Sequence, residues 1–362
     1  MPGGRPTQLA DWGERCPRWA GIRSDVVDVH GTRVHLLRAD ARTTASNAPT
    51  QLLIHPMAAG ATMWLDAIGP LTAYGPVVAP DLPGSVIGDS ASPHRSAPRA
   101  EISARFLRAL TSILGLDRVV VHGWSFGGLV SMLFADLAPE RVERLVLVNS
   151  SLPFPLSTRQ RLGWQTLGRI AVLLGTPLAR GLLRIGGAKV MELKQRNLAE
   201  PQDRWDLSGG DRSRLSPELL SLLSDQLARL RSRPQWIGAG ITALASVFSH
   251  MFIDQRRALE AIRRLPAPTL LVWGDQDPLI DRTVIDHVLG LRPDWHLHVI
   301  ETVGHLPANG GAGRLRRGRR RLAHHNEWSL ERAYLVGPDR RAEQHRAAIP
   351  PDITKAGSPD YA

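Results

Sequence analysis

The chain has 362 residues and a formal net charge of +11, and its 43% hydrophobic and 22% charged residues are typical of a soluble globular protein. Its one cysteine, Cys16, excludes an intramolecular disulfide bond and favours a reducing compartment, so we expect a cytoplasmic protein. We expect no transmembrane segment, because no run of eighteen apolar residues is uninterrupted, and no signal peptide, because residues 1–21 carry no apolar stretch.

The region from residue 26 to residue 301 alternates short apolar runs with stretches of helical periodicity. Residues 26–39 predict two strands around a glycine turn, and single strands are predicted at 52–56, 77–81, 119–123, 144–150, 269–274 and 297–301. Helices are predicted at 62–75, at 100–116 and directly after Ser125. This alternation indicates an α/β fold with a mostly parallel sheet and helices on both of its faces.

The alternation stops between residues 151 and 264, where Leu- and Arg-rich helical segments follow one another without a strand. We interpret this stretch as a helical cap over the carboxyl ends of the strands, where open α/β sheets bind ligands. The chain then divides into an N-terminal extension (1–24), a core in two parts (25–150 and 265–307), the cap (151–264) and a tail (308–362). Residues 167–191 also fit a membrane-surface helix, but we favour a solvated cap helix with its apolar face over the pocket.

The stretch VVVHGWSFGGLV, residues 119–130, places Ser125 between a buried strand and a helix. The flanking glycines predict a tight turn that lifts the hydroxyl clear of the sheet, beside the N–H groups of the helix start. A serine needs a base to become nucleophilic. Later strand ends offer Asp275, Asp277 and Asp281 and then His305. A glycine-rich turn with an incidental serine is the plain alternative, but an acid and a histidine in this order favour a catalytic triad.

These motifs resemble those of the α/β-hydrolase fold family, in its capped, esterase-like form related to epoxide hydrolases and haloperoxidases. The resemblance covers about residues 25–307 and rests on HGWSFGG (122–128), GDQDP (274–278), VGHLP (303–307), LLIHPMAAGATMW (52–64) and DLPGSVIGDS (81–90). It implies that Ser125 is the nucleophile, His305 the base and Asp277 the orienting acid, with an oxyanion hole made by the backbone N–H groups of Met57 and Phe126. It implies neither a metal nor an organic cofactor.

Two positions bear on these assignments. Asp277 has the family's Gly-x-x-Asp spacing from Gly274, and Asp275 is the next candidate for the acid. Where the family carries His-Gly in its oxyanion loop, this chain has His55 followed by Pro56. Proline has no N–H to donate, so the donor is expected from the next residue, Met57.

The resemblance implies hydrolysis of a carboxylic ester through an acyl-enzyme. An apolar cap would suit a small-molecule substrate that is an apolar acyl or aromatic ester. Alternatives are carbon–carbon bond hydrolysis, a cofactor-free haloperoxidase-like activity, or a catalytically silent binding protein of the same fold. Epoxide hydrolase chemistry fits poorly, because such enzymes use an aspartate at the turn and tyrosines in the cap. This chain has Ser125 at the turn, and its tyrosines, Tyr74, Tyr334 and Tyr361, lie outside the cap.

The composition changes abruptly after Pro307. From Leu306 onward, eleven Lys or Arg stand against six Asp or Glu, a net charge of +5. The resemblance implies a Glu-Pro motif and an amphipathic final helix here, but the Gly- and Arg-rich run has no apolar face, so we expect a disordered basic tail. We hypothesise a frameshift near residue 307 or 308, because one GC-rich coding of this run, read one base later, encodes an Ala-rich helix. A nucleic-acid-binding arm is the competing hypothesis, but the run lacks interleaved aromatics, so no specific nucleic-acid partner is expected.

Overall fold

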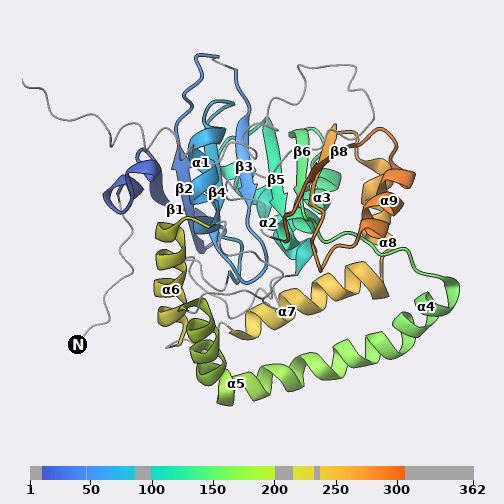
Figure 1. Cartoon of the computed structure of the whole chain (residues 1–362). Coiled ribbons are helices and arrows are strands. Elements are labelled where there is room, and N and C mark those ends of the chain that lie inside the picture. The colour runs from blue at the N-terminus through green and yellow to red at the C-terminus, as the bar shows by residue number, and fades with distance from the viewer. Residues whose placement is uncertain (1–9, 46, 86–98, 200–214, 232–236, 306–362) are drawn as a thin grey trace, which may run out of the picture.

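The computed structural model describes residues 10–45, 47–85, 99–199, 215–231 and 237–305. The strands of this part form one eight-stranded sheet in the order β1-β2-β4-β3-β5-β6-β7-β8 (Figure 1). They are β1 (Arg23–Val29), β2 (Thr32–Ala39), β3 (Thr50–Ile54), β4 (Val77–Pro80), β5 (Val119–Trp124), β6 (Val142–Val148), β7 (Thr269–Gly274) and β8 (His296–Ile300). β2 pairs antiparallel with β1 and β4, and all other pairs are parallel. The predicted α/β fold with a mostly parallel sheet is confirmed.

The central strands are buried on both faces over most of their length, which explains the apolar runs in their sequences. In β6, Leu145 and Leu147 pack into one hydrophobic core, and Val146 and Val148 pack into a second core on the opposite face. This division follows from the two-residue period of a strand. The edge strand β8 is only half-buried over most of its length.

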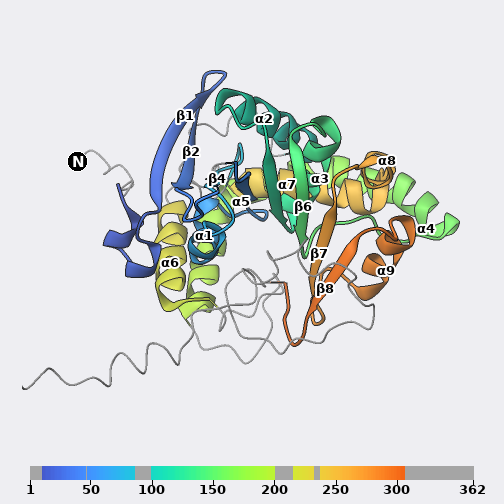
Figure 2. The ribbon, with the colours of Figure 1, turned by 90° about the horizontal axis from the view of Figure 1, so that it is seen from above.

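Helices cover both faces of the sheet (Figure 2). The first core receives buried side chains from α2 (Ala100–Ile113), α3 (Phe126–Leu137), α8 (Arg256–Arg264) and α9 (Arg282–Leu291). The second core receives them from α1 (Leu65–Leu71), from α6 (Pro217–Arg231) and from the 3-10 turns Trp12–Glu14 and Pro17–Trp19. The described part of the N-terminal extension therefore packs against the sheet domain. Its Trp19 indole donates a hydrogen bond of 2.8 Å to Asp66 of α1, and Arg15 pairs with Asp225 of α6.

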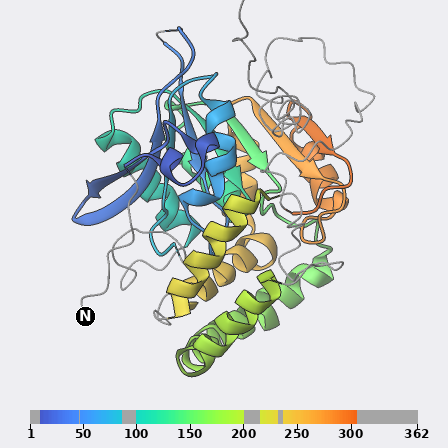
Figure 3. The ribbon, with the colours of Figure 1, turned by 60° about the vertical axis from the view of Figure 1, so that its left-hand side comes forward.

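The chain leaves the sheet after β6 and returns at β7, and its described elements in between are helical. They include α4 (Thr158–Gly163), α5 (Arg169–Ala199) and α7 (Ile237–Phe248), with π-helical turns at Trp164–Gly168 and Ser249–Ile253. α7 lies between the sheet and α5, and α5 runs along the outside of the molecule (Figures 1 and 3). Phe252 stacks on Phe154 and on Trp164, with ring centroids 4.6 and 4.8 Å apart, which ties the two ends of this helical stretch together.

We propose that this stretch is the cap expected from the sequence. α8 falls within the expected cap boundaries, yet it packs with α3 and α9 in the first core. Its buried residues, Ala258, Ala261 and Ile262, lie on one face, so an amphipathic helix at the end of the stretch joins the sheet layer instead. The helix Thr158–Leu183 is long and apolar enough, by length and composition alone, to cross a bilayer, and its apolar window is not buried. From the sequence we expected no transmembrane segment, because no run of eighteen apolar residues is uninterrupted. This helix has no such run either, because Arg169 interrupts it.

The disorder and the frameshift were predicted for the tail at 308–362, which lies outside the described residues, so both stay predictions.

Candidate active site

Ser125 stands at the turn between β5 and α3. Its backbone has φ 53° and ψ −117°, a conformation that residues other than glycine adopt only under constraint. Neighbouring glycines make room for the turn. A Cβ on Gly123 would lie 2.6 Å from the Gly127 oxygen, and one on Gly127 would lie 2.6 Å from the His55 oxygen. The glycines therefore allow α3 to start directly against β5 and the end of β3, with Ser125 at the apex.

His305 lies within hydrogen-bond distance of both Ser125 and Asp277. Its Nε2 is 2.8 Å from Ser125 Oγ, and its Nδ1 is 2.8 Å from Asp277 Oδ2. Because an ionised carboxylate can only accept, Nδ1 carries the proton and Nε2 accepts the hydrogen bond of the serine hydroxyl. The Asp277 side chain is fully buried and Ser125 is half-buried, so the contacts run from the interior to an accessible hydroxyl. The three residues predicted as a triad are thus brought together.

The other two acids after β7 lie elsewhere. Asp275 is exposed, and Asp281 is an exposed residue that caps the first turn of α9. Asp277 is held in place through its second oxygen, Oδ1, which accepts the N–H groups of Leu279 at 2.8 Å and of Ile280 at 3.1 Å. Of the three candidates, Asp277 alone has a described contact with the histidine.

Asn149, directly after β6, joins the segments that carry the acid and the histidine. Its buried side chain donates through Nδ2 to the Gly304 oxygen and accepts through Oδ1 from the Gly274 N–H, both at 2.9 Å. The Trp124 indole adds a hydrogen bond of 3.0 Å to the backbone oxygen of His305. Sequence reasoning missed Asn149, although a polar residue directly after an apolar strand, at the same sheet edge as the serine, was the available signal.

The predicted oxyanion donors, Met57 and Phe126, lie on segments whose backbones touch. The contact is made by Gly127, which packs directly on the backbone oxygens of Ile54 and His55. Within the described part of the chain, neither the Met57 nor the Phe126 N–H donates a hydrogen bond. Both groups can therefore bind a developing negative charge, and the Phe126 N–H opens α3, where the helix dipole favours such a charge.

His55 fixes the start of the loop that carries Met57. Its Nε2 accepts the Leu82 N–H at 3.0 Å and its Nδ1 donates to the Pro56 oxygen at 2.8 Å, so both ring nitrogens are used. Burial lowers the pKa of His55, against the opposing influence of the Asp81 charge, and the ring is neutral at neutral pH. His55 therefore has a structural role in this loop, in which Pro56 supplies an acceptor in place of an N–H.

Asp81, in the turn after β4, supports the same loop from the other side. Its Oδ1 accepts the Ala61 N–H at 2.7 Å, and its Oδ2 lies 3.0 Å from His35 Nδ1. Burial acts to raise the pKa of Asp81, but the hydrogen bond and charge of His35 and the hydrogen bond from the Ala61 N–H together lower it below its usual value. The carboxylate is thus ionised and can hold the loop in place.

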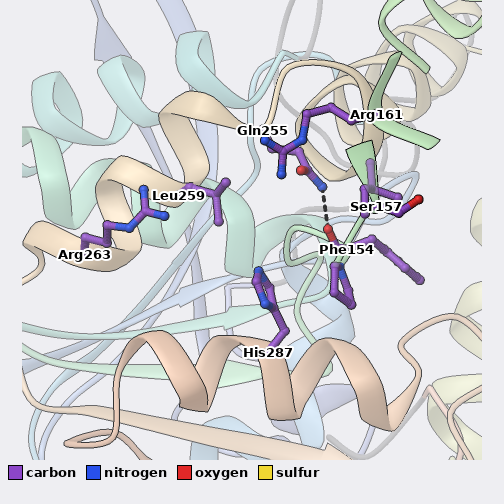
Figure 4. A pocket seen from close by; sticks show the side chains of 9 residues that line it. Phe154, Ser157, Arg161, Gln255, Leu259, Arg263 and His287 are labelled. Atoms are coloured by element: carbon purple, nitrogen blue, oxygen red, sulfur yellow. Dashed lines mark hydrogen bonds between the residues drawn. The ribbon is translucent and has the colours of Figure 1, made fainter. Parts of the chain in front are cut away.

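A separate cavity of about 350 Å³ lies between the start of the helical stretch and helices α8 and α9 (Figure 4). Arg161, Arg263 and His287 give it a basic lining, and burial together with the two arginine charges lowers the pKa of His287. In its wall, the Gln255 amide donates to the Phe154 oxygen at 2.8 Å. No member of the triad lines this cavity, so it is distinct from the site at Ser125.

The groups brought together here are the Ser125 hydroxyl and the His305 imidazole with the buried Asp277 carboxylate behind it, and the Met57 and Phe126 N–H groups lie on neighbouring segments. Together they can carry out acyl transfer. Among the described residues, no cluster of three or more His, Cys, Asp or Glu side chains could hold a metal ion.

Known proteins with similar sequences or structures include hydrolases. A protein of Mycobacterium tuberculosis (strain H37Rv) that is named only as uncharacterized is 29% identical over 294 residues, or 77% of this chain and 74% of that protein. A 2-hydroxy-6-oxononadienedioate/2-hydroxy-6-oxononatrienedioate hydrolase of Cupriavidus pinatubonensis is 26% identical over 277 residues, or 74% and 84%. The structure of naproxen esterase from Bacillus subtilis matches with a TM-score of 0.52 at 19% identity, over 82% of this chain and 90% of that chain. The model of the alpha/beta hydrolase family matches residues 51–310. With most of its length matched in this way, the chain belongs to the alpha/beta hydrolase family.

Proposed function

We propose that this protein is a serine hydrolase that cleaves a carboxylic ester through an acyl-enzyme on Ser125. The observation that carries the proposal is the 2.8 Å contact between Ser125 Oγ and His305 Nε2, backed by the 2.8 Å contact between His305 Nδ1 and Asp277. A serine at a strained strand-to-helix turn, with a histidine and a buried carboxylate behind it, is the arrangement that acyl transfer requires.

Each step of the reaction has a group to perform it. As Ser125 Oγ attacks the ester carbonyl carbon, its proton moves to His305 Nε2, and Asp277 stabilises the imidazolium that forms. The N–H groups of Met57 and Phe126 bind the oxyanion. Its collapse breaks the ester C–O bond, and His305 returns the proton to the leaving alkoxide. Water then attacks the acyl-enzyme by the same route, with its proton passing to His305, and the acid and free Ser125 are released.

Carbon–carbon bond hydrolysis is a second candidate, favoured by the similarity to the 2-hydroxy-6-oxononadienedioate/2-hydroxy-6-oxononatrienedioate hydrolase. The same serine, histidine and oxyanion donors can serve both reactions, since both pass through an oxyanion on a carbonyl carbon. The two proposals differ in the leaving group, which is an alkoxide for an ester and a carbanion equivalent for a dienone. Substrate turnover therefore separates them.

The test is turnover of p-nitrophenyl esters of increasing acyl length by the full chain, alongside a 2-hydroxy-6-oxodienoate substrate. We expect ester turnover with a preference for apolar acyl groups, and the Ser125→Ala variant should lose about 10⁶-fold in kcat. Turnover of the dienoate alone would move the assignment to carbon–carbon hydrolysis. If a folded protein turned over neither substrate class, the hydrolase proposal would be wrong and a silent binding protein would be favoured.

A further inference from the structure

The outer helix of the cap exposes a row of large apolar side chains. We call the set Leu167, Ile170, Leu174, Leu178 and Leu182 the apolar stripe, and each member is between 53% and 73% exposed. The members follow one another at intervals of three or four residues, which places them on one face of the helix. Soluble monomers rarely expose a contiguous apolar surface of this kind, and where they do it is a site of interaction.

The opposite face of the same helix is packed. Gly168 is buried and Val172 and Leu183 are half-buried, at positions that lie across the helix from the apolar stripe. α5 packs against α6 and α7, and α7 separates it from the sheet (Figures 1 and 3). The apolar stripe therefore faces outward, away from the core and from Ser125. None of its five side chains is buried where α5 packs on α6 and α7.

The charges beside the apolar stripe have one sign. Between Thr158 and Leu183 the sequence contains four arginines, Arg159, Arg161, Arg169 and Arg180, and no Asp, Glu or Lys. All four arginines are exposed, and none forms an ion pair with a described residue. Arg161 also lines the cavity beside α8 and α9, and the Arg180 side chain lies next to Gly238 of α7, so Arg159 and Arg169 are the two that contact neither. A helix with an outward apolar face flanked by arginines suits a surface that is both apolar and anionic.

We propose that this helix lies on the surface of a membrane that contains anionic lipids. The apolar stripe would enter the boundary between headgroups and acyl chains, and Arg159 and Arg169 would bind lipid phosphates. A helix that crosses the bilayer fits less well, because its inner face packs on α6 and α7 of the folded cap. Self-association through the stripe fits less well too, because it would bring exposed arginines of two copies, with no acidic residue between Thr158 and Leu183, close together.

The test is flotation of the full chain with vesicles of phosphatidylglycerol and phosphatidylcholine in equal parts, at about 0.1 M salt. We expect the chain to float with these vesicles. It should bind pure phosphatidylcholine vesicles several-fold more weakly, because the attraction between the arginines and the anionic lipid is lost. The double variant Leu174→Ser, Leu178→Ser should bind at least about tenfold more weakly, because two exposed apolar anchors are removed. Ile113→Ser, an exposed apolar residue of α2 that is 46% exposed, is the matched control and should bind like the wild type.

Four outcomes would overturn the proposal. The wild type does not float with either vesicle. The double variant binds as the wild type does, while a full chain with glutamine in place of Arg316, Arg317, Arg319, Arg320 and Arg321 loses binding. This result would assign membrane binding to the tail. The wild type is a dimer in solution that the double variant converts to a monomer without any vesicle binding. The protein resists extraction from the vesicles at alkaline pH, as a membrane-spanning protein does. None of these readouts is of catalysis, so the result does not depend on the proposed hydrolase activity.

Discussion

Three acidic residues, Asp275, Asp277 and Asp281, follow β7, and the proposed chemistry depends on which of them orients His305. Asp277 is buried and 2.8 Å from Nδ1, whereas Asp275 is exposed in the same loop. Asp277→Asn should lower kcat about 10³–10⁴-fold, because an amide stabilises the wrong tautomer of the histidine and cannot stabilise its cation. Asp275→Asn is the control and should stay within about twofold. Equal losses in the two variants, measured by ester turnover, would remove Asp277 from its proposed role.

The residues of the site differ in how far the sequence could predict them. Ser125, Asp277 and His305 each follow an apolar run, and carboxyl ends of parallel strands meet at one sheet edge, so their proximity could be predicted. The choice of Asp277 rested on its spacing from Gly274. Asn149 could not be assigned in the same way, because its function is to bond two backbone groups, at Gly274 and Gly304, that come from segments remote in the sequence.

At the scale of elements, the end of β6 is joined through Asn149 to the end of β7 and to the segment after β8. Asn149→Ala should lower the free energy of unfolding by about 2–4 kcal/mol, because a buried N–H and a buried C=O are left without partners. It should also lower kcat, since Gly304 directly precedes His305. Asn47→Ala, at an exposed position, should change the free energy of unfolding by less than about 0.5 kcal/mol. Urea unfolding measures both, and a stability change as small in Asn149→Ala as in the control would contradict this account.

An ion pair between a buried histidine and a half-buried glutamate links α2 of the sheet layer to the π-helical turn after α7. His250 Nε2 lies 3.2 Å from Glu101 Oε1. The hydrogen bond to His250 is the main cause that lowers the pKa of Glu101 to about 2, with help from Arg257 and against the effect of burial. Burial acts to lower the pKa of His250, but Glu101, the Ser246 oxygen and Asp254 together raise it above its ordinary value near 6.5.

The two shifts predict a pH window for the stability that this pair provides. Glu101 contributes above its unfolded pKa of about 4.5, and the contribution is lost as the pH falls toward 2. His250 contributes fully below about 6.5, and its part is lost as the pH rises through its raised pKa. The Tm difference between wild type and His250→Gln should therefore be largest at about pH 5–6 and shrink above it. Asp40→Asn, which breaks the exposed pair with Arg23, should show no such window. A Tm difference for His250→Gln that is constant from pH 4 to pH 9 would show that the pair is not the cause.

The elements were predictable to different degrees. Each predicted strand is present, because strands buried on both faces leave continuous apolar runs such as those of β5 and β6. The packing of α8 was not predictable, since an amphipathic pattern shows that a helix has a buried face but not which layer covers it. For the same reason the sequence could not show that α5 turns its leucines outward.

At the scale of the whole molecule, the segment after β8 must hold His305 in place. The family resemblance implies a covering helix after the histidine, but residues 306–362 have a different composition and lie outside the described residues. Within the described part, the Trp124 and Asn149 side chains hold this segment through backbone oxygens, and the Gln276 N–H donates to the Val303 oxygen at 3.0 Å. These bonds, all between described residues, position the histidine. The frameshift hypothesis is decided by the coding DNA: codons that cannot encode a helix in the neighbouring frame would end it.

The central claim is that Ser125 is a nucleophile activated by His305, and a fluorophosphonate probe tests it most directly. The probe reacts with a serine only where a base and an oxyanion hole assist it. Mass spectrometry of the labelled full chain should find one adduct, on Ser125, and His305→Ala should abolish labelling while circular dichroism shows that the variant remains folded. Folded wild-type protein that stays unlabelled, or labelling that persists in His305→Ala, would contradict the account.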